Sequence, residues 1–183
     1  MRIAILNDVH LNLTYDYGCS FPFCYDHGMY GLDPPSQLVD TLLDDMQRQY
    51  PYLDAILIQG DSLIHGLSVG ATSPTNNWPQ QKIILQTLLQ KVSQRFTTTP
   101  ILLNIGNNDV LVHYSAPKLA DKAMFYGDLK QMLFLDIPQN DKWRTMYGEL
   151  ETTMLDGGYY KYNISSDLSV LVINSIYFGI KNS

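Results

Sequence analysis

Short apolar runs separated by long mixed segments dominate the pattern of hydrophobic and polar positions along the chain. The runs occupy residues 3–6, 55–58 and 101–105, and a stretch containing Asp or Gly follows each of them. Runs of this length, rich in Ile, Leu and Ala, are typical of buried parallel strands that end in loops. We therefore predict three central strands, the second over residues 54–59 and the third ending at Gly106.

Two segments between these runs carry apolar residues at helical spacing. Residues 36–49 and 78–96 are predicted helices, and Ser36 is the predicted N-cap of the first. The predicted buried stripe of the first helix is Leu38, Leu42, Leu43 and Met46, and that of the second is Ile84, Leu85, Leu88, Leu89 and Val92. The alternation of strands and helices predicts an α/β fold, with a mostly parallel sheet flanked by helices.

The last third of the chain carries a weaker pattern. Residues 119–135 and 142–151 are predicted helices. Residues 159–164 and 168–175 are a predicted pair of strands, and turns are predicted at Asp156-Gly157 and Ser166-Asp167.

Composition and charge narrow the class of protein. The 183 residues suffice for one domain with a core, and the hydrophobic fraction of 45% with 16% charged residues is typical of a globular protein. The net charge is −6 without a basic patch, so we expect no nucleic-acid binding driven by charge. No apolar run is long enough to span a bilayer. Met1 leads directly into the first strand, so we expect no signal peptide in this chain.

Two cysteines, Cys19 and Cys24, lie in the long loop that follows the first predicted strand. They are either unrelated free thiols or a local disulfide, and a disulfide would indicate an oxidising compartment. Asn12 and Asn163 begin Asn-x-Ser/Thr triplets, which permit glycosylation if the chain enters the secretory pathway.

Candidate chemistry comes directly after the three predicted strands. Asp8 and His10 follow the first strand, Asp61 the second and Asn107 the third. Parallel strands deliver their carboxyl ends to one edge of a sheet, where ligands bind. Asp8 and His10 are one residue apart, so a strand-like segment would point both the same way and turn Val9 into the core. Carboxylate, imidazole and amide oxygen together predict a mixed metal site suited to Zn, Mn or Fe. Taken singly, the motifs are weak signals, because a lone Asp-x-His is more typical of a surface loop and a lone Gly-Asp or Asn-Asn-Asp of a turn.

The order of these motifs resembles that of the calcineurin-like metallophosphoesterases. The closer resemblance is to the acid-sphingomyelinase-like branch, which includes the endopolyphosphatases. It rests on the Gly-Asp-x-x-x-His spacing of residues 60–65, on Tyr-Gly-Leu-Asp-Pro-Pro at residues 30–35, and on Gly-Asn-Asn-Asp-Val at residues 106–110 with His113 after it. The resemblance implies the N-terminal half of an αββα sandwich, so residues 1–183 would form a phosphoesterase domain that is incomplete at its C-terminus.

The resemblance also implies roles for individual residues. Asp8 and His10 would bind one divalent metal ion, Asp61 would bridge two ions, and Asn107 would bind the second. Zn is the first expectation for both ions, with Mn or Fe as alternatives. His65 would lie near the substrate phosphate as a hydrogen-bond donor or proton carrier. The alternative for His65 is a loop histidine bonded to the backbone.

The chain departs from the family pattern at two points. Asn108 stands where most members have a catalytic histidine, and an amide can donate a hydrogen bond but cannot deliver a proton. The pattern also needs three further histidines downstream, whereas the four histidines of this chain are His10, His27, His65 and His113. We interpret His27 as an ordinary loop residue and His113 as structural. Two ions held only by Asp8, His10, Asp61 and Asn107 would be under-coordinated.

We expect a metal-dependent phosphoesterase that cleaves a phosphodiester or a phosphoanhydride, such as a sphingomyelin-like phospholipid, a nucleotide or polyphosphate. The alternatives are a truncated or degenerate non-catalytic fragment and an α/β binding domain without metal. The resemblance suggests the extracellular space or the lysosomal or vacuolar lumen. We expect this chain alone to turn over substrate poorly, and to self-associate through the apolar face that the second sheet would cover.

Overall fold

A parallel sheet of three strands lies at the centre of the protein. The computed structural model describes residues 1–15, 27–68, 74–137 and 147–179. The sheet has the order β1-β2-β3, with β1 at Ile3–Leu6, β2 at Ala55–Gln59 and β3 at Ile101–Asn104. In its register Ile5 lies beside Leu57, and Leu57 beside Leu102. The predicted α/β class and the three predicted strands are confirmed.

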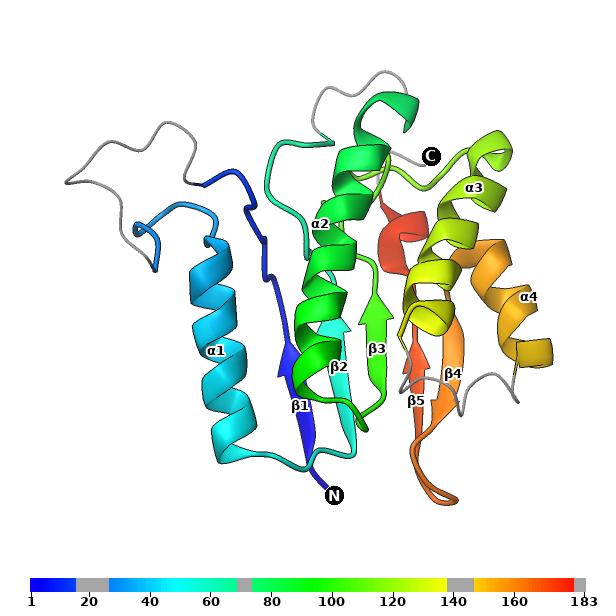
Figure 1. The fold of residues 1–183 in the computed structure, drawn as a ribbon. Coiled ribbons are helices and arrows are strands. Elements are labelled where there is room, and N and C mark those ends of the chain that lie inside the picture. Colours follow the sequence, from blue (N-terminus) through cyan, green and yellow to red (C-terminus); the bar gives the residue numbers. More distant parts are fainter. Residues whose placement is uncertain (16–26, 69–73, 138–146, 180–183) are drawn as a thin grey trace.

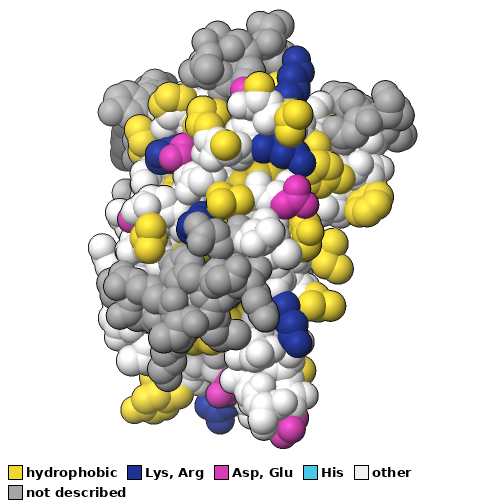
Figure 2. Space-filling model, turned by 90° about the vertical axis from the view of Figure 1, so that its right-hand side faces the viewer, with side chains coloured by type: hydrophobic (Ala, Val, Ile, Leu, Met, Phe, Trp, Pro, Cys, Tyr) yellow, Lys and Arg dark blue, Asp and Glu magenta, His cyan; other side chains and the backbone are white. Residues whose placement is uncertain are grey.

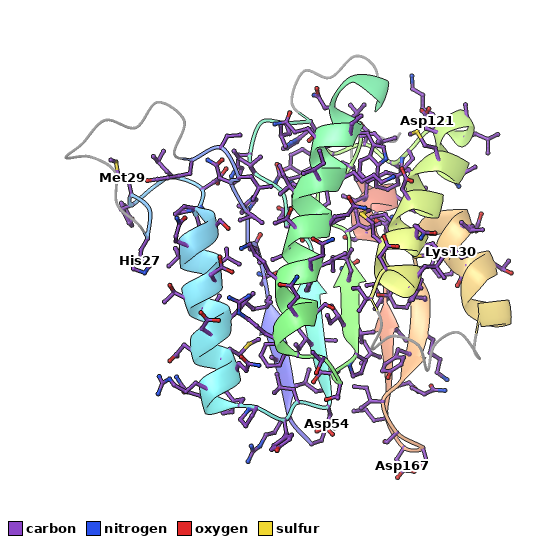
Figure 3. All side chains as sticks on the ribbon, in the orientation of Figure 1. His27, Met29, Asp54, Asp121, Lys130 and Asp167 are labelled. Atoms are coloured by element: carbon purple, nitrogen blue, oxygen red, sulfur yellow. The ribbon has the colours of Figure 1, made fainter. Side chains whose placement is uncertain are left out.

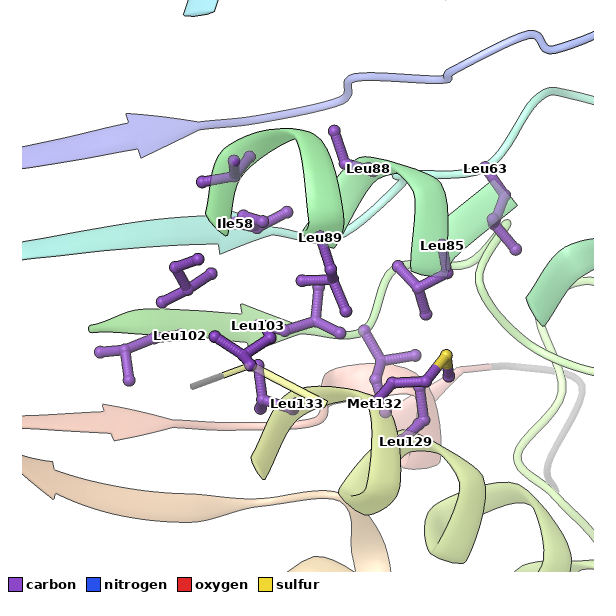
Figure 4. Packing of buried hydrophobic residues seen from close by; sticks show 14 of the residues in the cluster. Ile58, Leu63, Leu85, Leu88, Leu89, Leu102, Leu103, Leu129, Met132 and Leu133 are labelled. Atoms are coloured by element: carbon purple, nitrogen blue, oxygen red, sulfur yellow. The ribbon is translucent and has the colours of Figure 1, made fainter. Parts of the chain in front are cut away.

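Two long helices connect these strands. They are α1 at Ser36–Gln49 and α2 at Pro74–Arg95, and they flank the sheet in Figure 1. The predicted stripe of α2 is buried in full, and Figure 4 shows Leu85, Leu88 and Leu89 packed with residues of the strands and of the next helix. The helix begins at Pro74, before the predicted start at Trp78. The prediction missed residues 74–77 because they carry no periodic apolar signal.

The predicted stripe of α1 was wrong in part. Val39 and Leu43 are the buried residues of this helix, whereas Leu38 and Leu42 are exposed. The side of α1 nearest α2 carries acidic residues, which form ion pairs with Lys91 and Arg95 of α2 through Asp40 and Asp44. The N-cap is Pro35, and no side chain caps the helix, so the predicted cap at Ser36 was also wrong.

The C-terminal part of the chain adds two helices and a hairpin. Helix α3 spans Leu119–Lys130 and continues as a wider π-helical turn at Gln131–Leu135. Helix α4 spans Tyr147–Gly157, so it runs past the predicted end at residue 151, and Asp156-Gly157 is its last turn instead of a separate loop. Residues 142–146 of that predicted helix lie outside the described residues.

The final strand pair is antiparallel, with β4 at Tyr160–Asn163 and β5 at Ser169–Val172. The predicted extension of β5 to Ser175 was wrong. Asn174 accepts a hydrogen bond from the backbone of Ile176, and this bond starts a 3-10 helix at Ser175–Phe178. The tip of the hairpin carries Asp167, as predicted for a turn, at the foot of Figure 3.

The hairpin lies alongside β3 without forming a ladder with it (Figure 1). Instead, the hydroxyl of Tyr160 accepts a hydrogen bond from the backbone N–H of Leu103 and donates one to its carbonyl, each at 2.9 Å. A side chain thus satisfies the backbone groups that a fourth strand would otherwise pair. In the described part of the chain the parallel sheet has three strands.

Some predictions fall outside the described part of the chain. Cys19 and Cys24 both do, so the choice between free thiols and a disulfide stays open. Within the described ranges, no helix combines the length and the apolar character that crossing a membrane requires. On the face over α3 and α4, Figure 2 shows acidic and basic side chains interspersed with hydrophobic ones.

Candidate metal centre

The loops after β1, β2 and β3 leave the same end of the sheet, at the top of Figure 1. Backbone hydrogen bonds join the first two of these loops. The N–H of His10 donates to the carbonyl of Asp61 and the N–H of Leu11 to that of Ser62, each at 2.9 Å. This pairing brings the predicted ligands of the first two loops together.

The backbone adopts the left-handed conformation at three predicted ligands. The φ angles are 50° at Asp8, 45° at His10 and 47° at Asp61. The prediction that a strand-like segment would align Asp8 with His10 was therefore wrong in its mechanism, because β1 ends at Leu6. Non-glycine residues rarely adopt this conformation, and such strain gathers at functional sites. Val9 between them packs against the core in part, as predicted.

A pair of glycines lets the second and third loops approach closely. A Cβ on Gly60 would lie 2.7 Å from the backbone N of Gly106, and φ at Gly60 is 75°. A Cβ on Gly106 would lie 2.1 Å from Oδ1 of Asp61. Any side chain at either position would therefore displace Asp61 or its loop.

His10 is held with one nitrogen ready to bind a metal. Its Nδ1 lies 2.9 Å from the carbonyl of Leu63, which can only accept, so Nδ1 carries the proton. In the neutral ring this leaves the lone pair on Nε2, which lies 4.0 Å from Oδ1 of Asp8. Outer partners of this kind fix the orientation of metal-binding histidines.

Asp8, His10 and Asp61 form a donor set that fits a divalent cation. Their ligand atoms all lie within 4.8 Å of one another. Asp61 is held in place by the backbone N–H of Asn108, which donates to Oδ1 at 2.9 Å. Two carboxylates and an imidazole are hard-to-borderline ligands that suit Zn or Mn.

His65 lies against this set. Its ring stacks on that of His10, with centroids 3.8 Å apart and 19° between the planes. The ring bonds to a carboxylate instead of the backbone, because Nδ1 lies 2.6 Å from Oδ1 of Asp33. His10, Asp33 and His65 make a second group whose ligand atoms lie within 4.8 Å. Sequence reasoning gave Asp33 no role, although it lies in the Tyr30 to Pro35 stretch that carried the resemblance.

The third loop supplies Asn107, Asn108 and Asp109. Asn107 is half-buried, and its carbonyl accepts from the backbone N–H of Tyr114 at 3.5 Å. Asn108 is buried, and its side-chain oxygen has no hydrogen-bond partner among the described residues. The ligand role of Asn107 and the catalytic role of Asn108 stay predictions.

Asp109 is a second residue that sequence reasoning missed. It is buried, and its two oxygens accept hydrogen bonds from the backbone N–H groups of Ser62, Leu63 and Gly106. Burial, assisted by the nearby Asp61, raises the pKa of Asp109 to about 6, although the three N–H groups oppose the shift. Its position in the Asn-Asn-Asp motif was the available signal.

The other two histidines lie apart from this donor set. His27 lies beside α1 (Figure 3), with Nε2 3.2 Å from the hydroxyl of Thr41. The backbone N–H of His113 donates to the carbonyl of Ser68, and its ring packs edge-on against that of Tyr114.

Comparison with models of protein families identifies the family of this chain. A model of the calcineurin-like phosphoesterase family matches residues 1–177, which include all the residues placed above. The match is to the family as a whole and singles out no branch of it. A search of the curated proteins returned no match.

Proposed function

Because the chain belongs to the calcineurin-like phosphoesterase family, we propose that it hydrolyses a phosphodiester or a phosphoanhydride at a metal centre built on Asp8, His10 and Asp61. The observation that carries the proposal is the convergence of these three ligand groups, from two loops, within 4.8 Å. Family membership by itself implies a hydrolase, and the donor set supports metal-dependent chemistry.

We assign two divalent ions to the centre, with Zn as the first choice and Mn or Fe as alternatives. Asp8 and His10 would hold one ion, Asp61 would contribute to both, and Asn107 would hold the second. When bound, such ions act as Lewis acids on a phosphoryl oxygen and activate the attacking water. With four protein ligands, both ions would have positions open for water and substrate and would bind weakly.

The chain's own residues orient this centre. The Leu63 carbonyl fixes the His10 ring, and the Asn108 backbone fixes Asp61. His65 stands beside them with an exposed side chain, so we assign to it the exchange of a proton with a leaving group. Asn108 contributes hydrogen bonds only.

The finer substrate assignment rests on the resemblance. Sphingomyelin-like phospholipids, nucleotides and polyphosphate all present the phosphoryl group that this chemistry needs. The same resemblance supports the extracellular space or the lysosomal or vacuolar lumen, and the glycosylation triplets at Asn12 and Asn163 are compatible with it.

Metal content and turnover test this proposal together. The chain is loaded with Zn or Mn, its metal content is measured by mass spectrometry, and hydrolysis of bis(p-nitrophenyl) phosphate is followed. We expect slow, metal-dependent turnover, and Asp61→Ala should lower both metal content and rate by more than about tenfold. Asp45→Ala on α1 is the matched control, because Asp45 pairs with Arg48 on the helix surface.

The outcomes separate the alternatives. Turnover that persists in EDTA, or that Asp61→Ala leaves unchanged, would overturn the proposal. Bound metal without turnover would favour the non-catalytic fragment. Rapid turnover would show that four ligands suffice and would contradict the expectation of poor activity.

A further inference from the structure

Both carboxylate oxygens of Asp33 form hydrogen bonds with the same residue, His65. Oδ2 accepts the backbone N–H of His65 at 2.7 Å, and Oδ1 lies 2.6 Å from Nδ1 of the same residue. The Asp33 side chain is only 17% exposed, so these bonds replace much of its hydration. A carboxylate only accepts, so Nδ1 of His65 is the donor in this pair.

The His65 side chain needs such a clamp to hold one orientation. It is 62% exposed, and an exposed side chain on a loop samples several rotamers. Asp33 fixes the backbone and the ring together, and the flat contact with His10 restrains the plane of the ring. The carbonyl of Leu63 fixes the ring of His10. The buried backbone at Leu63 therefore restrains the exposed His65 ring through its contact with His10.

The loop that carries Asp33 is anchored to the loop after β1. The backbone N–H of Asn12 donates to the carbonyl of Pro34 at 3.0 Å, and Asn12 forms an isolated bridge with Pro35. Asp33 is therefore attached to the same segment that presents Asp8 and His10. Three separate stretches of chain meet at one imidazole.

We propose that Asp33 is a positioning residue that holds His65 over His10 in the Nδ1–H tautomer, so that Nε2 of His65 is the ring atom presented to the phosphoryl group. The inference rests on the proposed function for the identity of the ligand. The geometry of the clamp stands without it. The clamp does for His65 what an aspartate does for the base of a hydrolytic triad, where the carboxylate sets the tautomer and the orientation of the ring.

The sharpest variant is Asp33→Asn. The amide oxygen can still accept the backbone N–H of His65, but the amide NH₂ then faces Nδ1 and donates to it. This exchange should invert the tautomer, placing the proton on Nε2, without removing the link between the loops. Asp33→Ala removes the clamp entirely, and Asp45→Asn on α1 is the control carboxylate.

Nitrogen-15 NMR of the imidazole rings, in metal-free protein, reads the tautomer directly. We expect Nδ1–H for His65 in the wild type and in Asp45→Asn, Nε2–H in Asp33→Asn, and a mixture in Asp33→Ala. His10 should stay Nδ1–H in every variant, because Leu63 holds it. An unchanged His65 tautomer in Asp33→Asn would overturn the proposal.

Kinetics give a second readout on the metal-loaded chain. Asp33→Asn should lower kcat by about 10- to 100-fold, with KM changing less than about twofold. The effect should vanish in a His65→Ala background, since a positioning residue acts through its partner. Additive losses in the double variant would contradict the assignment.

These experiments distinguish a failure of the Asp33 clamp from a failure of the proposed phosphoesterase function. If the wild type binds metal without turnover, the phosphoesterase assignment fails, and the NMR experiment still decides the clamp. If the wild type is active but Asp33→Asn keeps its tautomer and its kcat, the clamp fails and the function stands. If added Zn displaces the Nδ1 proton of His65, Asp33 and His65 are metal ligands, which also overturns the proposal.

Discussion

Asp109 joins the loops of the candidate metal centre through one buried carboxylate. Its two carboxylate oxygens accept hydrogen bonds from three backbone N–H groups, two in the loop after β2 and one in the loop after β3. Three N–H donors stabilise the ionised form, but burial outweighs them, and the pKa of Asp109 rises to about 6. The residue that joins the loops therefore carries a charge that the folded state disfavours.

This shift predicts a pH dependence of stability. The pKa of Asp109 is about 6 in the folded state and 3.8 when unperturbed. The folded state therefore binds the proton more tightly. The free energy of unfolding should fall as pH rises from about 4 to about 6 and then level off. At 1.36 kcal/mol per pKa unit the loss is on the order of 3 kcal/mol.

Urea unfolding across this pH range, with EDTA present, checks the prediction against Asp109→Asn. The variant does not titrate at this position, so the gap in unfolding free energy between wild type and variant should shrink or reverse as pH rises. Parallel profiles for the two proteins would show that Asp109 keeps an ordinary pKa.

Helix α2 shows how a single element ties the sheet to the rest of the core. Its stripe packs toward β2, β3 and α3 (Figure 4), and Leu88 within it is fully buried. The opposite side of the same helix carries Ile83, which is exposed. Both side chains are aliphatic and of equal size, so burial is the main difference between them.

We expect Leu88→Ala to lower the free energy of unfolding by about 2–5 kcal/mol, because it removes buried methyl groups and leaves a cavity. Ile83→Ala is the matched control and should cost less than about 1 kcal/mol. Chemical denaturation of both variants measures the difference. Equal losses would mean that α2 does not pack as described.

Across the whole molecule, one apolar surface lies open beside the sheet. Leu57, Leu102, Leu171 and Ile173 line a shared hollow, and Ile5 lies next to Leu57 in the register. Ile5 is 57% exposed and Leu171 66% exposed. A contiguous apolar surface of this kind favours association in water.

This apolar surface is the basis for the prediction that the chain self-associates. We expect light scattering after size-exclusion chromatography to show dimers or larger species for residues 1–183. Ile5→Glu combined with Leu171→Glu should shift the chain toward monomer, because buried carboxylates oppose association. Leu119→Glu, at an exposed position on α3, is the control. A monomeric wild type would refute the prediction.

The sequence by itself determined the three strands of the parallel sheet, the buried stripe of α2 and the family. It also indicated Asp8, His10 and Asp61, which the fold brings together. Strand and helix periodicity are local signals, and the ligand motifs follow the strands that present them. It did not determine the stripe of α1, whose orientation depends on ion pairs with residues of α2 that are distant in sequence. Nor did it indicate the left-handed backbone at Asp8, His10 and Asp61.

Only the tertiary structure decided how the side chains at the site are held. The clamp of Asp33 on His65 joins residues 32 positions apart, and the bonds of Asp109 to Ser62 and Leu63 join positions 47 and 46 residues apart. Residue type and local spacing contain no information on such pairs, because the folded sheet creates them when it brings its loops to one edge. The sequence thus indicated part of the groups that reach the site, and the fold determined their hydrogen-bond partners and the raised pKa of Asp109.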